Sequence, residues 1–351
     1  MNGILYGTTE YGGGKPSGGH GLGVVFSLDP KSGDETDEPF KKRGAKYPAA
    51  GLIYANGLLY GTTAQGGGPK ERGYGTVFSV DPGTGTRSIL HAFSGLDGAY
   101  PGAAVIDVKG VLYGTTGAGG SAGDGTVFSI DLSSGAETVL YSFQNNGVDG
   151  QYASGLVAVK GVLYGTTEEG GSTGDGVVFA IDPKTGTETV LHTFSGADGN
   201  LPKAGLTAVN GILYGTTARG GAYDGGTVFS LDPEAGTETV VYSFCKQKKN
   251  CPDGANPVAS LIDVKGTLYG TTGSGGANQY GTAFSLNPVT GAETVLYSFC
   301  SQVDCTDGWV PSGALLNLNG TLYGTTGYSG FTKCQNLHDE YCGGVVFSLK
   351  P

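Results

Sequence analysis

The sequence predicts an all-β fold, a seven-bladed β-propeller of four-stranded antiparallel blades. The pentapeptide Leu-Tyr-Gly-Thr-Thr occurs seven times, each copy beginning 50 to 55 residues after the previous one. Its tyrosines are Tyr6, Tyr60, Tyr113, Tyr164, Tyr214, Tyr269 and Tyr323. Each interval holds short apolar segments separated by turn residues, and no stretch has helical periodicity. Four short strands per repeat of about 50 residues are typical of a propeller blade; a right-handed β-solenoid, the alternative, usually has shorter and more uniform coils.

The repeat at residues 204–244 shows how one blade is built. Its expected strands are 205–209, 212–217, 227–231 and 238–244. The tight turn Asn210-Gly211 joins the first two strands, and Pro233 with Gly236 marks the turn before the fourth. The run 227–231 is apolar without clean alternation, as expected for strands buried on both faces between stacked blades.

The repeats run from Met1 to Pro351 without a linker, so we expect a single domain, 1–351. No first strand precedes Leu5, no fourth strand follows Leu349, and the fourth strand of the first repeat is degraded to a charged segment, 34–40. These features predict about 26 strands and an irregular closure between blades 1 and 7. Met1 leads directly into a repeat, which suggests that a leader has been trimmed from the chain.

Composition excludes several classes of protein. Glycine is abundant, at 68 residues, but 20 Tyr and 14 Phe in register argue against disorder, so the glycines mark turns. A formal net charge of −11 argues against a nucleic-acid partner, which needs clustered Lys and Arg. No apolar run approaches the roughly 20 residues of a membrane span.

The six cysteines form three local pairs near the C-terminal end. These pairs are Cys245 with Cys251, Cys300 with Cys305, and Cys334 with Cys342. Neither paired Cys-x2–4-Cys knuckles nor paired histidines accompany them, which disfavours zinc ligation. We expect three disulfides that staple long loops, and therefore an oxidising compartment outside the cytoplasm.

The whole chain resembles the GloVer-type tandem repeats of the choice-of-anchor family of exported bacterial proteins. The resemblance is carried by the seven Leu-Tyr-Gly-Thr-Thr blocks, by the Gly-Gly pairs after them, and by Gly-Thr-Val-Phe-Ser-x-Asp-Pro, as at residues 75–82. It implies export and display at the cell surface. It implies no particular activity, and we expect no anchor within these repeats.

In an up-and-down blade, the second-to-third loops and the fourth-to-first loops share one face. We call this the loop face; it holds the long, variable, cysteine-bearing connections, whereas the opposite face has tight turns. Recognition is expected on the loop face, because function concentrates in variable loops on a rigid scaffold. The repeated Tyr and Phe residues are expected to pack between blades. His91 and His192, which replace a fourth-strand tyrosine, are expected to be structural as well.

Residues that depart from the repeat are the candidate site. Glu10 and His20 lie in the long loop of blade 1, and His338 and Asp339 in the corresponding loop of blade 7. Histidines and carboxylates at one rim would suit general acid–base catalysis; an exposed polar loop held by cysteines is the alternative. The candidate binding residues are Tyr11, Glu168, Glu169, Arg219, Tyr223, Tyr280, Trp309 and Tyr328. Aromatic residues with polar neighbours suit sugars or protein partners; packing of the loops themselves is the alternative.

We predict no cofactor. Calcium at the recurring Asp-Gly turns is the alternative, although no Asp-x-Asp-x-Asp-Gly loop supports it. The predicted function is that of an exported recognition module or scaffold that binds a glycan or protein partner at a surface. One alternative is a secreted carbohydrate-active enzyme, a polysaccharide lyase or glycoside hydrolase. Another is a protein that self-associates into a surface layer or filament.

Overall fold

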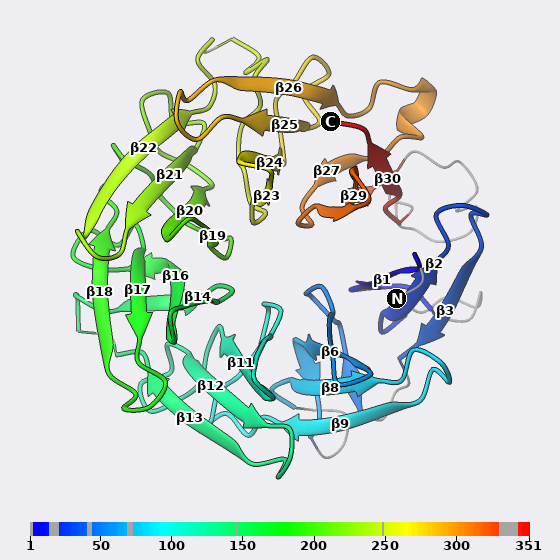
Figure 1. Ribbon diagram of the computed structural model, residues 1–351, viewed down its shortest axis with the longest axis vertical. Helices are drawn as coiled ribbons and strands as arrows, with labels where there is room; N and C mark the ends of the chain where they lie inside the picture. Colours follow the sequence, from blue (N-terminus) through cyan, green and yellow to red (C-terminus); the bar gives the residue numbers. More distant parts are fainter. Residues whose placement is uncertain are drawn as a thin grey trace. The chain divides into compact units, whose positions relative to one another are not determined.

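A computed structural model describes residues 3–13, 21–40, 44–68, 73–144, 146–247, 249–329 and 343–351. These residues form 30 strands and one short 3-10 helix, η2 (Val303–Cys305). The strands make successive antiparallel sheets, one for each repeat (Figure 1). The predicted fold class is therefore confirmed: the protein is an all-β, seven-bladed β-propeller.

The chain comprises two compact units, Met1–Gly165 with Ala180–Thr189, and Thr166–Phe179 with Val190–Pro351. In the first unit, the first repeat supplies β1 (Leu5–Thr9), β2 (Val24–Leu28) and β3 (Glu35–Pro39). The second supplies β5 (Ile53–Ala55), β6 (Leu58–Thr63), β8 (Thr76–Val80) and β9 (Arg87–Ala92). The third supplies β10 (Ile106–Val108), β11 (Val111–Thr116), β12 (Thr126–Asp131) and β13 (Glu137–Ser142). Each sheet is ordered as its strands occur in the chain.

The fourth repeat, whose residues are divided between the units, supplies β15 (Val157–Val159), β16 (Val162–Gly170), β17 (Val177–Ile181) and β18 (Glu188–Thr193). In the second unit, the fifth repeat supplies β19 (Thr207–Val209), β20 (Ile212–Thr217), β21 (Thr227–Asp232) and β22 (Thr237–Ser243). The sixth supplies β23 (Ile262–Val264), β24 (Thr267–Thr272), β25 (Thr282–Leu286) and β26 (Glu293–Ser298). The seventh supplies β28 (Leu316–Leu318), β29 (Thr321–Tyr328) and β30 (Val346–Leu349). The strands expected within 204–244 are found with ends shifted by no more than two residues.

Four further short strands lie in loops, which leaves the expected 26 strands in the blades of the described chain. They are β4 (Ala45–Lys46), β7 (Gln65–Gly66), β14 (Gly150–Ala153) and β27 (Trp309–Pro311). No described helix is long and apolar enough to span a bilayer. The expected single domain and the expected closure of blade 1 on blade 7 stay predictions.

The innermost strand, which the sequence leaves open, is the short first strand of each blade. In the first unit β10 contacts β5 and β15, and in the second unit β23 contacts β19 and β28. The fourth strands of a unit, such as β9 and β13, lie at the outer edge (Figure 1). Blades 2 to 6 therefore widen from a three-residue inner strand to an outer strand of six or seven residues.

The glycine of the repeated pentapeptide lies beneath an aromatic ring. In the third blade Gly114 of β11 is the register partner of Phe128 in β12. A Cβ atom at Gly114 would lie 2.5 Å from Cζ of Phe128 and 3.0 Å from Cγ1 of Val105. Both of these side chains are fully buried. The repeated Gly and Phe therefore form one cross-strand unit, in which the ring covers the backbone that glycine leaves bare.

The two threonines of the pentapeptide satisfy buried polar groups. Thr115 Oγ1 donates a hydrogen bond to the carbonyl of Ser154 in the following repeat, at 2.9 Å. Thr116 Oγ1 lies 2.9 Å from Thr126 Oγ1 across the strand pair, and the Thr126 amide donates to Thr116 Oγ1 at 3.0 Å. Threonine suits these positions because it combines a β-branched shape with a hydroxyl group.

Phenylalanines join neighbouring blades, as the sequence predicts. The phenylalanine that directly follows the outer strand of one blade packs edge-to-face on the phenylalanine in the third strand of the next blade. Phe93 and Phe128 have ring centroids 5.1 Å apart at 67°, and Phe244 and Phe284 repeat the arrangement at 5.1 Å and 67°. Burial of these rings supplies hydrophobic contact in every described interface of this kind.

The charged segment 34–40, expected as the degraded fourth strand of the first repeat, forms a regular strand. The segment Glu35–Pro39 forms β3 and pairs with β2 in full register, from Leu28 with Glu35 to Val24 with Pro39. Most of its side chains are exposed. Backbone hydrogen bonds to β2 hold this strand, although it lacks the apolar side chains by which strands are recognised in a sequence.

Candidate functional site

The loop face is held by backbone hydrogen bonds between the two classes of loop, which confirms that they adjoin. The amide of Tyr100, in the fourth-to-first loop, donates to the carbonyl of Tyr74, in the preceding second-to-third loop, at 2.7 Å. The Tyr100 carbonyl then accepts from Gly117 at 3.1 Å. The same first bond recurs in the pairs Tyr47–Leu22 (2.9 Å), Tyr152–Asp124 (3.4 Å), Leu201–Asp175 (3.1 Å), Asn256–Gly225 (2.8 Å) and Val310–Tyr280 (3.0 Å).

The donor residue in each pair has a left-handed backbone although it is not glycine. Tyr100 has φ 56°, and the equivalent residues lie between 55° and 60°. Such a conformation costs roughly 1–2 kcal/mol for an L-residue. In the Tyr100 loop the following Pro101 packs against Gly75, where a Cβ atom would lie 2.5 Å from the proline Cδ. The hydrogen bonds and this close packing hold a strained residue in place, as is common at functional sites.

In the first unit, tyrosines at this strained position, at its partner position and at Tyr11 in the loop after β1 are exposed to solvent. Tyr11, Tyr74, Tyr100 and Tyr152 are 57%, 45%, 47% and 48% exposed. The rings of Tyr11 and Tyr47 lie 5.5 Å apart, and those of Tyr74 and Tyr100 lie 6.4 Å apart. Tyr47 and Tyr74 are not among the candidates from the sequence. Their positions, before a proline and before the glycine that precedes the third strand, could have identified them.

In the second unit three aromatic residues form a continuous group on the loop face. Trp309 in β27 lies 6.1 Å from Tyr280 and stacks on Tyr328 of β29 at 5.8 Å and 25°. Trp309 and Tyr328 are also register partners in the sheet. Tyr280 and Tyr328 are 45% and 41% exposed. The structure therefore brings three of the predicted binding residues together, whereas Tyr223 is an exposed residue of a separate loop.

The charged candidates on the loop face are placed singly. Glu168 pairs with Lys203, with 3.4 Å between the ammonium nitrogen and Oε2. Glu169 is exposed, and its carbonyl accepts a hydrogen bond from the hydroxyl of Thr167. Arg219 is exposed and pairs through its backbone with Asn200. These three residues stay predicted binding residues.

The predicted seam site falls largely outside the described residues. Glu10 is exposed just after β1. His20, His338 and Asp339 lie outside the described residues, so their acid–base role stays a prediction. Among the cysteines, the disulfides Cys245–Cys251 and Cys300–Cys305 are confirmed. The pair Cys334 and Cys342 also lies outside the described residues.

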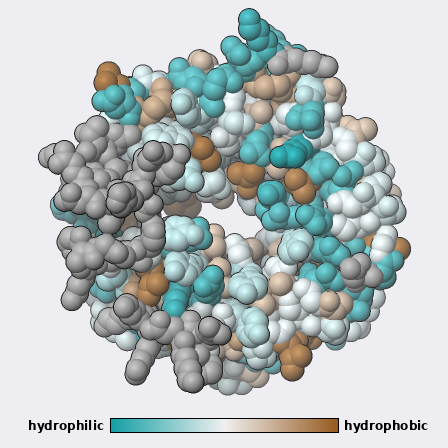
Figure 2. Space-filling view, turned by 180° about the vertical axis from the view of Figure 1, so that it is seen from behind, coloured by the Kyte–Doolittle hydropathy of each residue, from teal (hydrophilic) through white to brown (hydrophobic). Residues whose placement is uncertain are grey.

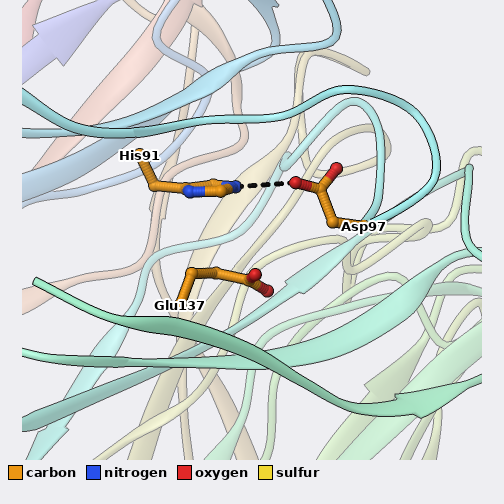
Figure 3. Close-up of side chains that lie close together, drawn as sticks. All are labelled: His91, Asp97 and Glu137. Carbon is orange, nitrogen blue, oxygen red and sulfur yellow. Dashed lines mark hydrogen bonds and ion pairs between the residues drawn. The ribbon is translucent and has the colours of Figure 1, made fainter.

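A second feature, missed by sequence reasoning, is a cluster of titratable side chains between outer strands. His91 in β9, Asp97 in the next loop and Glu137 at the start of β13 place their ligand atoms within 4.8 Å of one another (Figure 3). His91 Nε2 donates to Asp97 Oδ2 at 2.9 Å. His192, Asp198 and Glu238 form the same cluster in the second unit, with 3.0 Å between Nε2 and Oδ2.

Two carboxylates meet in each cluster, and their surroundings differ. Burial acts to raise the pKa of Asp97, but hydrogen bonds from the Ser94 amide and hydroxyl and from His91 outweigh it, so this pKa is lowered. Burial is the main cause that raises the pKa of Glu137, with a further contribution from the charge of Asp97. For Glu238, burial and the charge of Asp198 raise the pKa to about 7. Glu137 Oε1 and Glu238 Oε1 are buried with no hydrogen-bond partner among the described residues.

The same positions carry tyrosine in the alternate interfaces. Tyr141 donates to Asp149 Oδ2 at 2.7 Å, beside Glu188, and Tyr242 donates to Asp253 Oδ2 at 2.9 Å and to Glu293 at 3.3 Å. Burial and the charge of Asp149 raise the pKa of Glu188 to about 7. Burial is also the main cause that raises the pKa of Glu293 to about 7. The sequence signal was available as a histidine or tyrosine followed by an Asp-Gly turn in repeats 2 to 6, and as a glutamate near the start of the fourth strand in repeats 3 to 6.

The interface between the first two blades replaces this acidic cluster with an opposite pair of charges. By register, Glu38 occupies the position of His91, since each pairs with the valine before the third-strand phenylalanine. Arg87 begins β9, as Glu137 begins β13. Arg87 donates to the Pro39 carbonyl at 2.5 Å and lies 4.1 Å from the Phe40 ring centroid. A cation is therefore accommodated between blades at this position.

A family model of the Gloeobacter/Verrucomicrobia repeat matches residues 1–168 and 151–351, which together span the whole chain. The chain belongs to the Gloeobacter/Verrucomicrobia repeat family. The predicted resemblance is thus confirmed, and the pentapeptide, its Gly–Phe pairing and its threonine hydrogen bonds describe how this repeat forms a blade. No curated protein sequence matches the chain.

Solved structures with a similar fold have low sequence identity to this member of the repeat family. An oligogalacturonate lyase in complex with manganese is similar with a TM-score of 0.52 and 9% identity, over 87% of this chain and 79% of that one. A chain of a nidogen/laminin complex has a TM-score of 0.48 and 13% identity, over 83% and 91%. TolB from Acinetobacter baumannii has a TM-score of 0.47 and 13% identity, over 83% and 62%. At these identities the likeness concerns the fold alone.

Proposed function

We propose that this repeat-family propeller is an exported recognition module that binds a glycan through the aromatic side chains of its loop face. The observation that carries the proposal is the set of solvent-exposed tyrosines, with Trp309, that the loops present on this face. Aromatic rings offer flat apolar area with a polar tip, at low cost in conformational entropy. Sugar rings, which have apolar faces edged by hydroxyl groups, match such side chains.

The support comes from how these rings are held. Tyr100 is fixed by a strained backbone and by hydrogen bonds to two neighbouring segments. The stacked pair Trp309 and Tyr328 belongs to a strand pair rather than to a free loop. Preorganised side chains lose little freedom on binding, so more of the contact energy is available for affinity.

The character of the surface favours a polar ligand. On the face seen in Figure 2, strongly hydrophobic residues are scattered singly among hydrophilic and intermediate ones. Most exposed large hydrophobic residues of the described chain are tyrosines. A protein partner that relies on a broad apolar patch fits this surface less well than a glycan does.

The two disulfides are the evidence for the proposed export. Cys245–Cys251 and Cys300–Cys305 both staple loops between the fourth strand of one repeat and the first strand of the next. Disulfides persist mainly in oxidising compartments and are rare in the cytosol. A surface location would also place the loop face in contact with polysaccharides of the cell's surroundings.

The test is a screen of neutral and acidic polysaccharides in which binding and product release are measured on the same samples. We expect saturable binding without new reducing ends or unsaturated products. Tyr100→Ala and Tyr152→Ala should each weaken binding about tenfold, corresponding to 1.4 kcal/mol. Tyr54→Ala is the matched control, because Tyr54 is 54% exposed but lies in β5, outside the loop face. It should bind as the unchanged protein does.

The alternatives give different results in the same experiment. New reducing ends or unsaturated products would identify a hydrolase or lyase and would contradict a purely binding role. Concentration-dependent polymers without glycan binding would favour a self-assembling surface protein. Equal affinity of Tyr54→Ala and Tyr100→Ala would mean that binding does not use the loop face.

A further inference from the structure

We propose that the two histidine clusters, His91 with Asp97 and Glu137, and His192 with Asp198 and Glu238, are binding sites for a divalent transition-metal ion that joins neighbouring blades. Each cluster takes two ligands from the end of one blade and one from the start of the next blade's outer strand. Asp97 lies in the same fourth-to-first loop as Tyr100, but none of the cluster ligands is an aromatic residue of the proposed glycan site, and the proposal does not depend on glycan binding.

The donor set fits an ion of the zinc class. Imidazole nitrogen and carboxylate oxygen are ligands that Zn²⁺ binds at about 2.0–2.2 Å. In the first cluster these atoms lie within 4.8 Å of one another. An ion bound by His91 Nε2 and Asp97 would replace the proton that now joins them and release it to solvent. Imidazole is a ligand for transition metals rather than for Ca²⁺, which takes oxygen ligands. The proposal therefore differs from calcium binding at the Asp-Gly turns.

A second observation is that the glutamate of each cluster has a buried carboxylate oxygen without a hydrogen-bond partner among the described residues, as Glu188 and Glu293 have in two other interfaces. Glu137 Oε1 and Glu238 Oε1 are inaccessible to solvent and accept no hydrogen bond from the described residues. In Figure 3 the Glu137 carboxylate lies beside the bonded pair of His91 and Asp97. A buried carboxylate oxygen without a partner is costly, and a bound cation would satisfy it.

Two other interfaces carry a positive charge at this place. Arg87 supplies one between the first two blades, where Glu38 is its charged neighbour. Lys246 supplies one beside Glu293, with its Nζ 4.3 Å from the ring centroid of Tyr242. In the described part of the chain, no lysine or arginine is paired with the acids of the two histidine clusters. A bound ion would fill that role.

Solvent can reach both clusters. The side chains of His91 and Asp97 are 19% and 21% exposed, and those of His192 and Asp198 are 19% and 22% exposed. An ion can therefore enter from solution without opening a blade. With three protein ligands, each site would keep an open position for water, as catalytic rather than closed structural zinc sites do.

The experiment is equilibrium dialysis of the full chain, first stripped with a chelator, against Zn²⁺, with metal counted per chain. His91→Tyr and His192→Tyr are the decisive variants, because Tyr141 and Tyr242 occupy the same register and show that tyrosine is accommodated. We expect each single variant to bind one ion fewer than the unchanged chain and the double variant two fewer, with unfolding midpoints in the presence of chelator unchanged. Tyr141→His should bind one ion more.

Glu137→Gln and Glu238→Gln provide a second readout that leaves each histidine in place. Each should weaken one of the two sites at least tenfold. Equal zinc content in the unchanged chain and in the double histidine variant would overturn the proposal, as would the absence of any zinc binding. Displacement of the zinc by an equal concentration of Ca²⁺ would also overturn it, since imidazole would then not be a ligand.

Discussion

Substitution of Gly114 by alanine tests how the repeated pentapeptide builds a blade. The added methyl group would lie 2.5 Å from Cζ of Phe128, 2.9 Å from its Cε1 and 3.0 Å from Cγ1 of Val105. Neither neighbour can move away, because both are fully buried and Phe128 also packs against Phe93 at 5.1 Å. Overpacking of this kind costs typically 1–3 kcal/mol. Alanine recovers about 0.5–1 kcal/mol relative to glycine in a strand, so a net loss of up to about 2.5 kcal/mol is expected.

The assay is urea unfolding with matched controls. Gly114→Ala should lower the urea midpoint while leaving the slope unchanged, which is the mark of a change in stability alone. Gly51→Ala is the control, because a methyl group there meets no atom within 4 Å. It should be neutral or stabilising by up to about 1 kcal/mol. Phe128→Leu in the Gly114→Ala background should cost less than in the unchanged chain. If Gly114→Ala were as stable as Gly51→Ala, the Gly–Phe unit would not explain the conserved spacing of the repeat.

Three further predictions follow from the described contacts. Burial and Asp149 raise the pKa of Glu188 to about 7, so the folded state takes up a proton between pH 4.5 and 7 and stability falls as pH rises through this window. Glu188→Gln should therefore stabilise the protein at pH 8 by on the order of 1 kcal/mol after solvent screening and have no effect at pH 4. In urea titrations it should differ from the exposed control Glu169→Gln at pH 8 and match it at pH 4. Tyr100→Gly should remove the cost of a left-handed backbone and so raise the free energy of unfolding by about 1 kcal/mol, yet weaken glycan binding. A lower free energy of unfolding in urea would show that Tyr100 is not strained. Mass spectrometry should show a gain of about six hydrogens on reduction, two for each of the three predicted cysteine pairs, whereas a gain of about four would leave Cys334 and Cys342 unpaired.

The blade strands could be predicted because each repeat carries its own pattern of apolar runs and turns. The strands at 212–217 and 227–232 begin where the sequence places them, and the turn residues between them set their ends. The charged strand β3 is expected only from its place in the repeat, because its side chains lack the apolar pattern and its pairing with β2 depends on backbone groups. The order of strands from inner to outer edge also depends on contacts between blades, which no single repeat encodes.

The candidate site was predictable only in part, for a physical reason. Exposed aromatic residues such as Trp309 and Tyr280 depart from the repeat and are therefore visible in the sequence. The histidine clusters are not, because Asp97 and Glu137 are 40 residues apart and meet only when one blade packs on the next. Residues that recur in register are expected to be structural, and for this reason the cluster that His91 and Glu137 form with Asp97 was not predicted from the sequence.

Trp309 permits the most direct test of the proposed recognition function, because it is the only tryptophan in the chain. It lies between Tyr280 and Tyr328 on the loop face, at 6.1 and 5.8 Å between ring centroids. A glycan that stacks on this group should shift or quench the tryptophan emission with the same dissociation constant that calorimetry gives. Trp309→Phe, which keeps a ring but removes the indole, should abolish the signal and weaken binding severalfold. Calorimetric binding with no change in emission, and with full affinity in Trp309→Ala, would contradict the account.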